Sequence, residues 1–474
     1  MNKIVSQIKK DFNQISDLKV KSYKGNLFSN IYIIYLQSIC SSNKINDYVL
    51  KNLSLLTSFN KNLDNLGNAL AGPNTVLNIT QKDIEFYLTN GFTLVIFKNK
   101  IYAIETKGEL SRNIDTANIE QTIKGPQDGF TENIEANIGQ IKRRIKSSNL
   151  KNIDLYIGRS TKTKISINYM DNIADLKNLN YILTKLEKID VDGILDSSII
   201  AHYIDGENKS MFPTIKQTER PDIVVKALLD GKIIIVVDTS PFILILPAYF
   251  IDFVNPISDN YTKSINVKFL KFLRLVCFGL SMLTPAIYLS LINYNQETIP
   301  TTLLINFATQ RINLPFPTIF EALIMLLICE ILRESDIRFP SSFGSSISVL
   351  GALILGEAAV SAGIVSPIMI IIISLTFISS LLFTELEISN ALRNYRFLFL
   401  LFAAVLGLYG VFLCTIIFLT NILSIKTINK PYFAPIMPFD KTYFDETVNK
   451  MPNKEQQKRS ILTTDKNFTR SKTL

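Results

Sequence analysis

The stretch DGKIIIVVDTSPFILILPAYF, residues 230–250, is long enough and apolar enough to cross a membrane. A single spanning helix would bury Asp238 at a cost of about 2.5–3.5 kcal/mol and would carry Pro241 in its interior. Two short β-prone runs joined by residues 238–241 instead predict a β-hairpin with these residues in its turn. A re-entrant or interfacial element is the alternative. The hairpin interpretation makes this stretch the end of a soluble domain and starts the membrane region near Phe272.

The composition on either side of this stretch divides the 474-residue chain. Lys, Asn, Asp and Glu are frequent before it, whereas Ile, Leu, Phe, Ala and Ser dominate from about residue 270 to 424. This contrast predicts an α/β soluble N-terminal region of two small subdomains, followed by an α-helical multi-pass membrane domain. The expected divisions are a polar N-terminal arm (1–35), α/β subdomain 1 (36–124), α/β subdomain 2 (125–262), a transmembrane domain (263–424) and a basic, flexible C-terminal tail (425–474).

Periodic patterns within the soluble region predict its elements. FTLVIFKNKIYAIET (92–106) is typical of a hairpin, because two β-rich runs flank Lys98-Asn99-Lys100. Four isoleucines at spacings of four and three predict an amphipathic helix within 131–148 (Ile134, Ile138, Ile141 and Ile145). The basic run KRRIK (142–146) ends this helix, either as a solvated terminus or as a patch that docks an acidic partner or lipid headgroups.

The membrane region contains apolar segments separated by charged connections. They lie at about 272–293, 316–332, 345–363, 364–383 and 397–422. Basic flanks before the first segment and in the tail favour the cytoplasm for both, so an even number of crossings is expected. Four crossings result if 345–363 is re-entrant or merges with its neighbour, and counting it separately gives five.

The segment at 345–366 is rich in glycine, serine and alanine. Small residues allow close helix packing, which is one interpretation. The other is a pore or gate, because Glu357 lies inside the segment and intramembrane carboxylates face protein or water. The same argument about intramembrane carboxylates applies to Glu321 and Glu330 in the segment at about 316–332. The candidate pore or gate residues are Gly351, Gly356, Glu357, Val360, Ser361, Gly363 and Ser366.

Composition and motifs argue against an enzyme. His202 is the only histidine, and the chain has no phosphate-binding GxxxxGK[ST] loop and no GxGxxG motif. The four cysteines, three of them inside apolar segments, lack metal-ligand spacing, so neither a metal nor a cofactor is expected. The net charge is +9, and the basic residues lie beside the apolar segments and in the tail. This placement indicates contact with membrane lipid and not with nucleic acid.

Three long blocks resemble the A subunits of GerA-type spore germinant receptors. They are GPQDGFTENIEANIGQIKRRIK (125–146), PTIKQTERPDIVVKALLDGKIIIVVDTSPFILILPAYF (213–250) and IRFPSSFGSSISVLGALILGEAAVSAGIVSP (337–367). The resemblance spans roughly residues 35 to 440. It implies a multi-pass protein of the spore inner membrane that works with a permease-like B subunit and a lipoprotein C subunit. In that family the B subunit is credited with binding the nutrient, and the A subunit with forming or gating an oligomeric ion pathway.

The resemblance also directs attention to the coupling between the soluble and membrane regions. We expect coupling residues in the second block, namely Glu219, Arg220, Asp222, Asp238 and Pro241. The N-terminus lacks the apolar core of a signal peptide, so the soluble region is expected on the cytoplasmic, spore-core side. Two other functions compete with this one: a secondary transporter, and a non-conducting membrane scaffold for germination partners.

Overall fold

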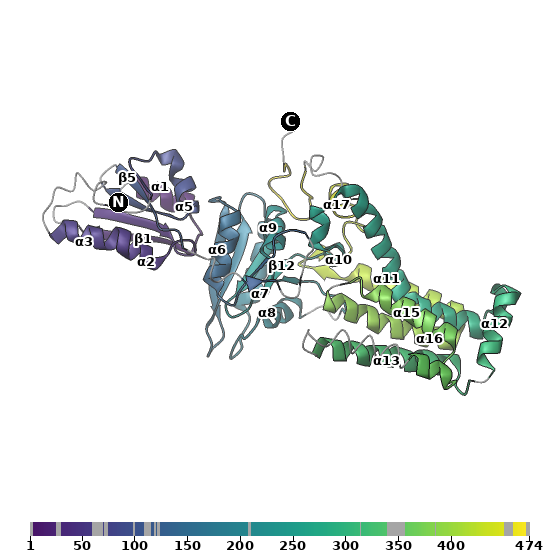
Figure 1. Cartoon of the computed structure of the whole chain (residues 1–474). Coiled ribbons are helices and arrows are strands. Elements are labelled where there is room, and N and C mark those ends of the chain that lie inside the picture. The colour runs from purple at the N-terminus through teal and green to yellow at the C-terminus, as the bar shows by residue number, and fades with distance from the viewer. Residues whose placement is uncertain are drawn as a thin grey trace.

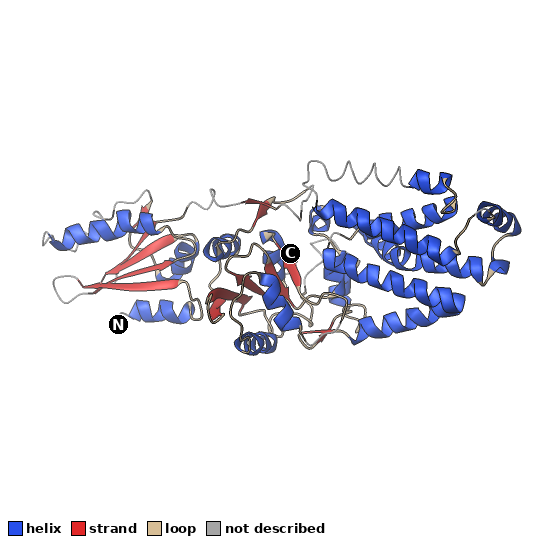
Figure 2. Cartoon of the chain, turned by 90° about the horizontal axis from the view of Figure 1, so that it is seen from below, coloured by secondary structure: helices blue, strands red, loops and turns tan. Residues whose placement is uncertain are grey.

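The computed structural model contains two α/β subdomains and a helical bundle arranged in a row (Figure 1). The structure describes residues 3–24, 30–58, 70, 74–97, 100–108, 115–117, 120, 124–206, 210–312, 314–338, 356–383, 385–449 and 458–470. The two sheets and the helical C-terminal half confirm the predicted fold class. Figure 2 separates the strand-containing part of the chain from the helical part.

Subdomain 1 is built on a five-stranded antiparallel sheet in the order β1-β2-β4-β5-β3. Its strands are β1 (Leu18–Lys24), β2 (Asn30–Leu36), β3 (Thr75–Val76), β4 (Phe92–Phe97) and β5 (Lys100–Glu105). Helices α1 (Lys3–Asp11) and α5 (Ile84–Thr89) cover one face. The other face packs against α2 (Ser42–Ile45) and the π-helical turn η1 (Asn46–Leu50), which continue into α3 (Lys51–Ser58). The predicted hairpin at 92–106 is confirmed as β4 and β5.

The expected N-terminal arm is instead part of subdomain 1. Helix α1 buries Ile4, Val5 and Ile8 against the sheet, because these apolar residues lie on one face of the helix. Strand β2 pairs with β1 on one side and with β4 on the other, so it is an interior strand. The prediction of a loose arm over 1–35 is therefore wrong, since those residues supply two of the five strands.

Subdomain 2 has a second five-stranded antiparallel sheet in the order β10-β12-β11-β9-β8. Its strands are β8 (Leu150–Ile157), β9 (Thr163–Met170), β10 (Lys216–Thr218), β11 (Ile233–Val237) and β12 (Ile243–Leu246). Helices α6 (Ile134–Arg144) and α9 (Pro221–Leu229) pack on one face. Helices α7 (Leu176–Glu187) and α8 (Ser197–Asp205) pack on the other. A short ribbon of β6 (Asp115–Thr116) and β7 (Asp128–Gly129) precedes this subdomain.

The quoted stretch is the β11–β12 hairpin at the centre of this second sheet. Ile233 pairs with Leu246, and every residue of both strands is buried. The turn contains Asp238 and Pro241, and Thr239 takes a positive φ of 71° there. The predicted hairpin is confirmed, and both of its faces are covered by helices, which explains the continuous apolar runs.

The chain then passes through α10 (Phe250–Val254) and the 3-10 turn η4 (Ile257–Tyr261) into a helical bundle. The bundle comprises α11 (Ser264–Asn293), η5 (Gln296–Thr298), α12 (Thr301–Arg311), α13 (Thr318–Arg338), α15 (Pro367–Ser380) and α16 (Leu386–Ser424). By length and composition, α11 and α16 could cross a membrane, and α15 is a shorter apolar helix.

Helix α16 is folded back on itself. Gly407 has a non-helical conformation (φ 59°, ψ −142°), and the rings of Tyr395 and Phe418 lie 4.9 Å apart. In a straight helix these rings would be separated by about 34 Å along the axis, given a rise of about 1.5 Å per residue. The expected single segment at 397–422 is therefore a hairpin of two helical arms that begins at Leu386.

The C-terminal region is not a free tail where it is described. It forms β13 (Lys426–Thr427), β14 (Lys430–Pro431) and α17 (Lys441–Thr447), and it buries Tyr432 and Tyr443. Thr464 donates a hydrogen bond to the carbonyl of Ile173 in subdomain 2. The prediction of a flexible tail over 425–474 is wrong for these residues, because their aromatic side chains complete the junction between subdomain 2 and the bundle.

Candidate coupling and gating site

An aromatic cluster joins subdomain 2 to the bundle. Phe212, from the loop before β10, stacks on Tyr395 with ring centroids 5.6 Å apart and meets Phe418 edge-on at 6.1 Å. Phe250 and Tyr432 close the cluster, each with its ring 6.4 Å from that of Phe212. Because Tyr395 and Phe418 belong to opposite arms of α16, Phe212 binds the folded-back helix on both arms at once.

Buried ion pairs surround this aromatic cluster. The Nζ atom of Lys216 lies 3.2 Å from Glu385, the residue before α16, and donates a 2.8 Å hydrogen bond to the Asp252 carbonyl. Burial lowers the pKa of Lys216, but Glu385, Glu120 and Asp252 outweigh burial and hold it above its usual value. Lys232 pairs with Asp252 at 2.5 Å, and Tyr443 of α17 donates to the same carboxylate at 3.0 Å. These pairs fix the start of α16 to β10 and α10.

Arg220 and Asp222, two of the expected coupling residues, form a second connection. Arg220 is 1% exposed, and its guanidinium group bonds both oxygens of Asp222 at 3.0 and 2.8 Å. It also donates to the carbonyls of Glu120 and Pro126, which lie in the segment leading from subdomain 1. The third expected residue, Glu219, accepts a 2.9 Å hydrogen bond from the backbone amide of Glu120.

This arginine cluster reaches the first bundle helix through Tyr261. The Tyr261 hydroxyl donates a 2.6 Å hydrogen bond to Asp222, and its ring lies directly over Gly125. Gly125 has φ of 118°, and a Cβ there would come within 2.6 Å of the ring. Two residues before Tyr261, Asp259 forms a bidentate pair with Arg274 of α11 at 2.6 and 3.1 Å. The chain thus has a continuous polar connection from the linker after subdomain 1 to α11.

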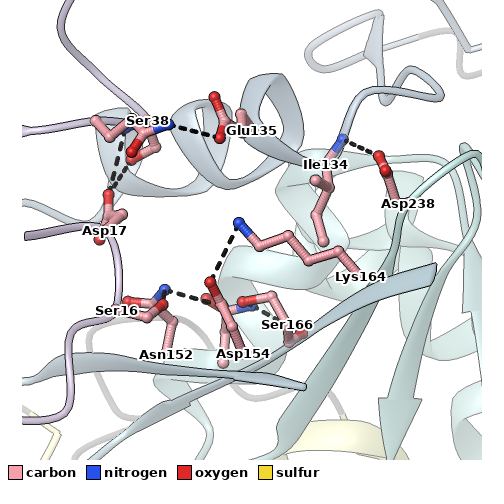
Figure 3. A network of polar contacts seen from close by, with 12 residues as sticks. Ser16, Asp17, Ser38, Ile134, Glu135, Asn152, Asp154, Lys164, Ser166 and Asp238 are labelled. Atoms are coloured by element: carbon pink, nitrogen blue, oxygen red, sulfur yellow. Dashed lines mark hydrogen bonds and ion pairs between the residues drawn. The ribbon is translucent and has the colours of Figure 1, made fainter. Parts of the chain in front are cut away.

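Asp238 and Pro241 lie elsewhere. Asp238 accepts a 3.3 Å hydrogen bond from the backbone amide of Ile134 at the start of α6 (Figure 3). The turn is at the opposite end of β11 from Lys232, about 17 Å away for a five-residue strand. The expectation that these two residues couple to the membrane is corrected by this placement: the hairpin's open end faces the bundle, and its turn faces away.

Subdomain 2 contacts subdomain 1 through polar groups. Asp17 pairs with the buried Lys142 of α6. Asp17 also accepts a hydrogen bond from the Ser38 hydroxyl, and Asn152 bonds Ser16 at 2.5 Å (Figure 3). Burial raises the pKa of Asp17, but Lys142 and Ser38 outweigh it and hold the pKa below 3.8.

The basic run 142–146 therefore contacts the chain's own subdomain 1, where Lys142 pairs with Asp17. Besides the Lys142 pair, Arg143 donates to the carbonyl of Gly108 at 2.5 Å and Lys146 donates to Asn90 at 2.6 Å.

The candidate gate is described from residue 356 onward, and Gly351 lies outside the described residues. A short helix at 356–361 exposes Glu357 and Ser361 and half-buries Val360. Gly356 has open space where a Cβ would stand, and Gly363 has a positive φ of 64°. Glu357 and Ser361 are exposed, and Glu357 has no ion pair among the described residues. The small-residue face at 356–361 is therefore not covered by the part of the chain that the structure describes.

Ser366 ends the gate segment and is held by a buried carboxylate. Glu321 of α13, 0% exposed, accepts hydrogen bonds from the backbone amide of Ser366 at 3.1 Å and from its hydroxyl at 2.9 Å. Ser366 immediately precedes α15, so Glu321 supplies the negative charge that a helix N-terminus favours. Arg311 lies 3.7 Å from the other oxygen of Glu321.

The sequence alone did not reveal several of these contacts. Phe212, Lys216, Tyr261 and Glu385 lie in short loops or at element ends, where no periodicity distinguishes them. His202 lines a cavity of about 360 Å³ with Asp205 and Glu387. Within the described part of the chain, no three His, Cys, Asp or Glu side chains are grouped to hold a metal ion.

The family model for the Bacillus/Clostridium GerA spore germination protein matches residues 6–462. The chain belongs to the GerA family of spore germination proteins. Spore germination protein KA of Bacillus subtilis is 33% identical over 96% of this chain and 85% of its own length. The uncharacterized membrane protein YfkQ of Bacillus subtilis is 34% identical, over 86% of this chain and 81% of its own length.

A solved structure is also similar to this GerA-family chain. It is the crystal structure of the N-terminal domain of the A subunit of the Bacillus megaterium spore germinant receptor GerK3. That domain is 28% identical, with a TM-score of 0.38, over 52% of this chain and 94% of its own. Membership of the GerA family, together with two apolar helices of spanning length, indicates association with a membrane.

Proposed function

We propose that this chain is the A subunit of a nutrient germinant receptor in the spore inner membrane, and that it forms or gates an oligomeric ion pathway. Its partners are a permease-like B subunit, which binds the nutrient, and a lipoprotein C subunit. Support comes from the family match over residues 6–462 and from relatives named as spore germination proteins. The proposal includes no catalytic step.

The proposed topology is multi-pass, with the soluble subdomains on the cytoplasmic side. Helix α11 begins beside subdomain 2 and ends at Asn293, and the hydroxyl of the next residue, Tyr294, bonds the carbonyl of Ala404 near the α16 turn. Helix α13 starts at that far end, where Thr318 bonds Asn293 at 3.0 Å, and returns so that Arg333 contacts Ser389. Because the chain enters and leaves the bundle beside subdomain 2, the total number of passes is even.

The proposed gating role rests on one observation: the aromatic cluster joins subdomain 2 to both arms of α16. Phe212 contacts both arms, and Lys216 pairs with Glu385 at the helix start. A movement of subdomain 2 therefore displaces α16, and α16 packs against α11, which in turn packs against α15, the helix that follows the gate segment. The uncovered small-residue face at 356–361 is where copies of the chain meet to line the pathway.

The test is ion flux through the assembled receptor. The A, B and C subunits are reconstituted into liposomes, and nutrient-triggered efflux of a monovalent cation is measured for wild type, Glu357→Ala and Val360→Ala. We expect both substitutions to change the flux, because both side chains border the proposed pathway. Glu297→Ala is the matched control, since Glu297 is an exposed glutamate in η5, outside the gate segment.

Other outcomes would replace the proposal. Unchanged flux and unchanged germination in both gate variants would reject the pathway at 356–366. Accumulation of a solute against its gradient would indicate a secondary transporter. Germination that survives deletion of residues 272–422, with a membrane anchor retained, would indicate a scaffold.

A further inference from the structure

Three arginines gather between α13 and α16 in the part of the bundle nearest subdomain 2. Arg333 comes from α13, whereas Arg393 and Arg396 come from the first arm of α16. Glu330 is the carboxylate they share: it lies 3.4 Å from Arg393 and 4.0 Å from Arg396. Arg333 bonds the hydroxyl of Ser389, a neutral partner.

The charges in this cluster do not balance. Guanidinium groups stay protonated in proteins, so the three arginines carry three positive charges, and the carboxylate they share, Glu330, carries one negative charge. Arg333 and Arg393 both lie close enough to Arg396 to repel it. A buried cation without a matching anion is costly, because its attraction to a partner must offset the loss of hydration.

Arg396 shows where the missing anion belongs. Its side chain is 2% exposed, and its Nε atom donates a 2.7 Å hydrogen bond to the carbonyl of Ser281 in α11. Its Nη2 atom is buried and has no acceptor among the described residues. A buried guanidinium nitrogen is rarely left unbonded, so the cluster lacks one acceptor at this point.

The cluster opens to the outside of the bundle, close to the end of the bundle that lies beside subdomain 2. Arg393 is 34% exposed, and it follows the start of α16 by seven residues, or about 10 Å. Arg333 precedes the end of α13 by five residues, or about 8 Å. Both ends lie beside subdomain 2, so the arginines are near the membrane surface on that side.

We propose that these three arginines bind a phosphate group, and that it is the headgroup phosphate of an anionic phospholipid in the leaflet next to subdomain 2. Arginine's planar fork of donors matches phosphate oxygens in pairs, and basic pockets between membrane helices on the cytoplasmic side bind such headgroups. The inference depends on the bundle lying in a membrane, but not on ion conduction or on germination. The bound lipid would hold α13 against α16.

The experiment measures lipid bound to the purified full-length chain by native mass spectrometry. Wild type, the double variant Arg333→Gln/Arg393→Gln and the control Lys268→Gln are each titrated with phosphatidylglycerol and with zwitterionic phosphatidylcholine. Lys268 is a matched control, because it is an exposed cation near the start of α11 on the same side. Arg396 is left unchanged, since its bond to Ser281 makes it part of the packing.

We expect the double variant to bind phosphatidylglycerol more weakly by about fivefold for each arginine removed, while Lys268→Gln binds as wild type does. Arg393→Lys keeps the charge but loses the fork, and we expect it to bind with intermediate affinity. Equal binding by wild type and the double variant, or equal binding of both lipids by wild type, would overturn the site. Thermal stabilisation by inorganic phosphate that disappears in the double variant would support the oxyanion site but reject a lipid as its source.

Discussion

Subdomain 2 has two interfaces of opposite character. Toward the bundle it presents aromatic rings around Phe212, enclosed by buried ion pairs. Toward subdomain 1 it presents side-chain hydrogen bonds and the buried pair of Lys142 with Asp17. Apolar contacts resist separation in proportion to buried area, whereas polar contacts can be exchanged for water at little net cost. The bundle side is therefore built to transmit displacement, and the subdomain 1 side to separate and rejoin.

The largest effect is expected at the turn of α16, on which the bundle-side interface depends. In Gly410→Val, the new Cβ would lie 2.1 Å from the carbonyl oxygen of Phe402, so the two arms must separate. We expect a loss of more than about 4 kcal/mol and little folded protein. Thermal unfolding of the detergent-solubilised chain measures this loss of stability. Gly279→Ala is the control: nothing lies within 4 Å of its Cβ position, and alanine should stabilise α11 by up to about 1 kcal/mol.

The second prediction concerns the aromatic contact itself. Phe212→Ala leaves a cavity between the arms of α16 and should cost about 3–5 kcal/mol. The neighbouring Met211 is 46% exposed, so Met211→Ala should cost less than about 0.5 kcal/mol. The two variants are compared by denaturant unfolding, with protease cleavage at the junction as the measure of unfolding. Similar losses in both variants would show that the aromatic contact is not what joins the two parts.

The third prediction tests the polar interface. Lys142→Ala leaves Asp17 buried without its cation, and we expect subdomain 1 to move away so that the carboxylate can be hydrated. Electron–electron resonance distances between labels at the exposed positions 86 and 195 should broaden and lengthen. Lys146→Ala, which removes an exposed hydrogen bond to Asn90, should change them little. An unchanged distance in Lys142→Ala would mean that the polar interface does not depend on this pair.

The same pair gives this interface a pH dependence with a defined sign. The pKa of Asp17 is lowered in the folded chain, so the contribution of Asp17 to the stability of this interface is present above the ordinary pKa of 3.8. The contribution is lost as the pH falls below 3.8 through the folded pKa. The label distances of wild type should therefore stay constant at neutral pH and lengthen only in acid.

The smallest effect is expected at Glu120, which contacts subdomain 2 between the two interfaces. Burial raises its pKa to about 7, helped by Glu385 and opposed by Lys216 and by hydrogen bonds from Thr218 and Glu219. A raised carboxyl pKa means that the contribution to stability is present below 4.5 and is lost as the pH rises through about 7. Hydrogen-exchange protection factors at residues 124–130, which are corrected for the intrinsic pH dependence of exchange, should fall severalfold between pH 5.5 and pH 8. Glu120→Gln should remove this pH dependence, and its persistence would assign it to another group.

The elements that the sequence predicted well are those whose pattern is local. Asp238 and Pro241 identified the hairpin because both residues suit a turn and a buried aspartate is costly in a spanning helix, and four isoleucines identified α6. Most of strand β2 was assigned to the N-terminal arm because its partner β4 lies about sixty residues later, and no local pattern reveals that pairing. Ile4, Val5 and Ile8 did carry a helical spacing that could have argued against a loose arm.

The site was predicted only in part. Arg220 and Asp222 do lie at the junction, whereas Asp238 and Pro241 lie at the far end of the same hairpin. The fold-back of α16 had a visible signal, because Gly407 and Gly410 interrupt an apolar run too long for one crossing. Phe212 had none: a single aromatic residue in a loop gains its role only from the helices that close around it.

The C-terminal segment has a consequence for the order of biosynthesis. Arg470 pairs with Asp230, 240 residues earlier, and Thr464 bonds Ile173, 291 residues earlier. Contacts of such long sequence separation form late, and the ribosome delivers these residues only after every bundle helix has been made. Subdomain 2 therefore cannot be completed until translation has passed through the whole bundle. A nascent chain with an unfinished bundle would leave Asp230 and the surface around it exposed, where quality-control proteases can distinguish it from the finished protein.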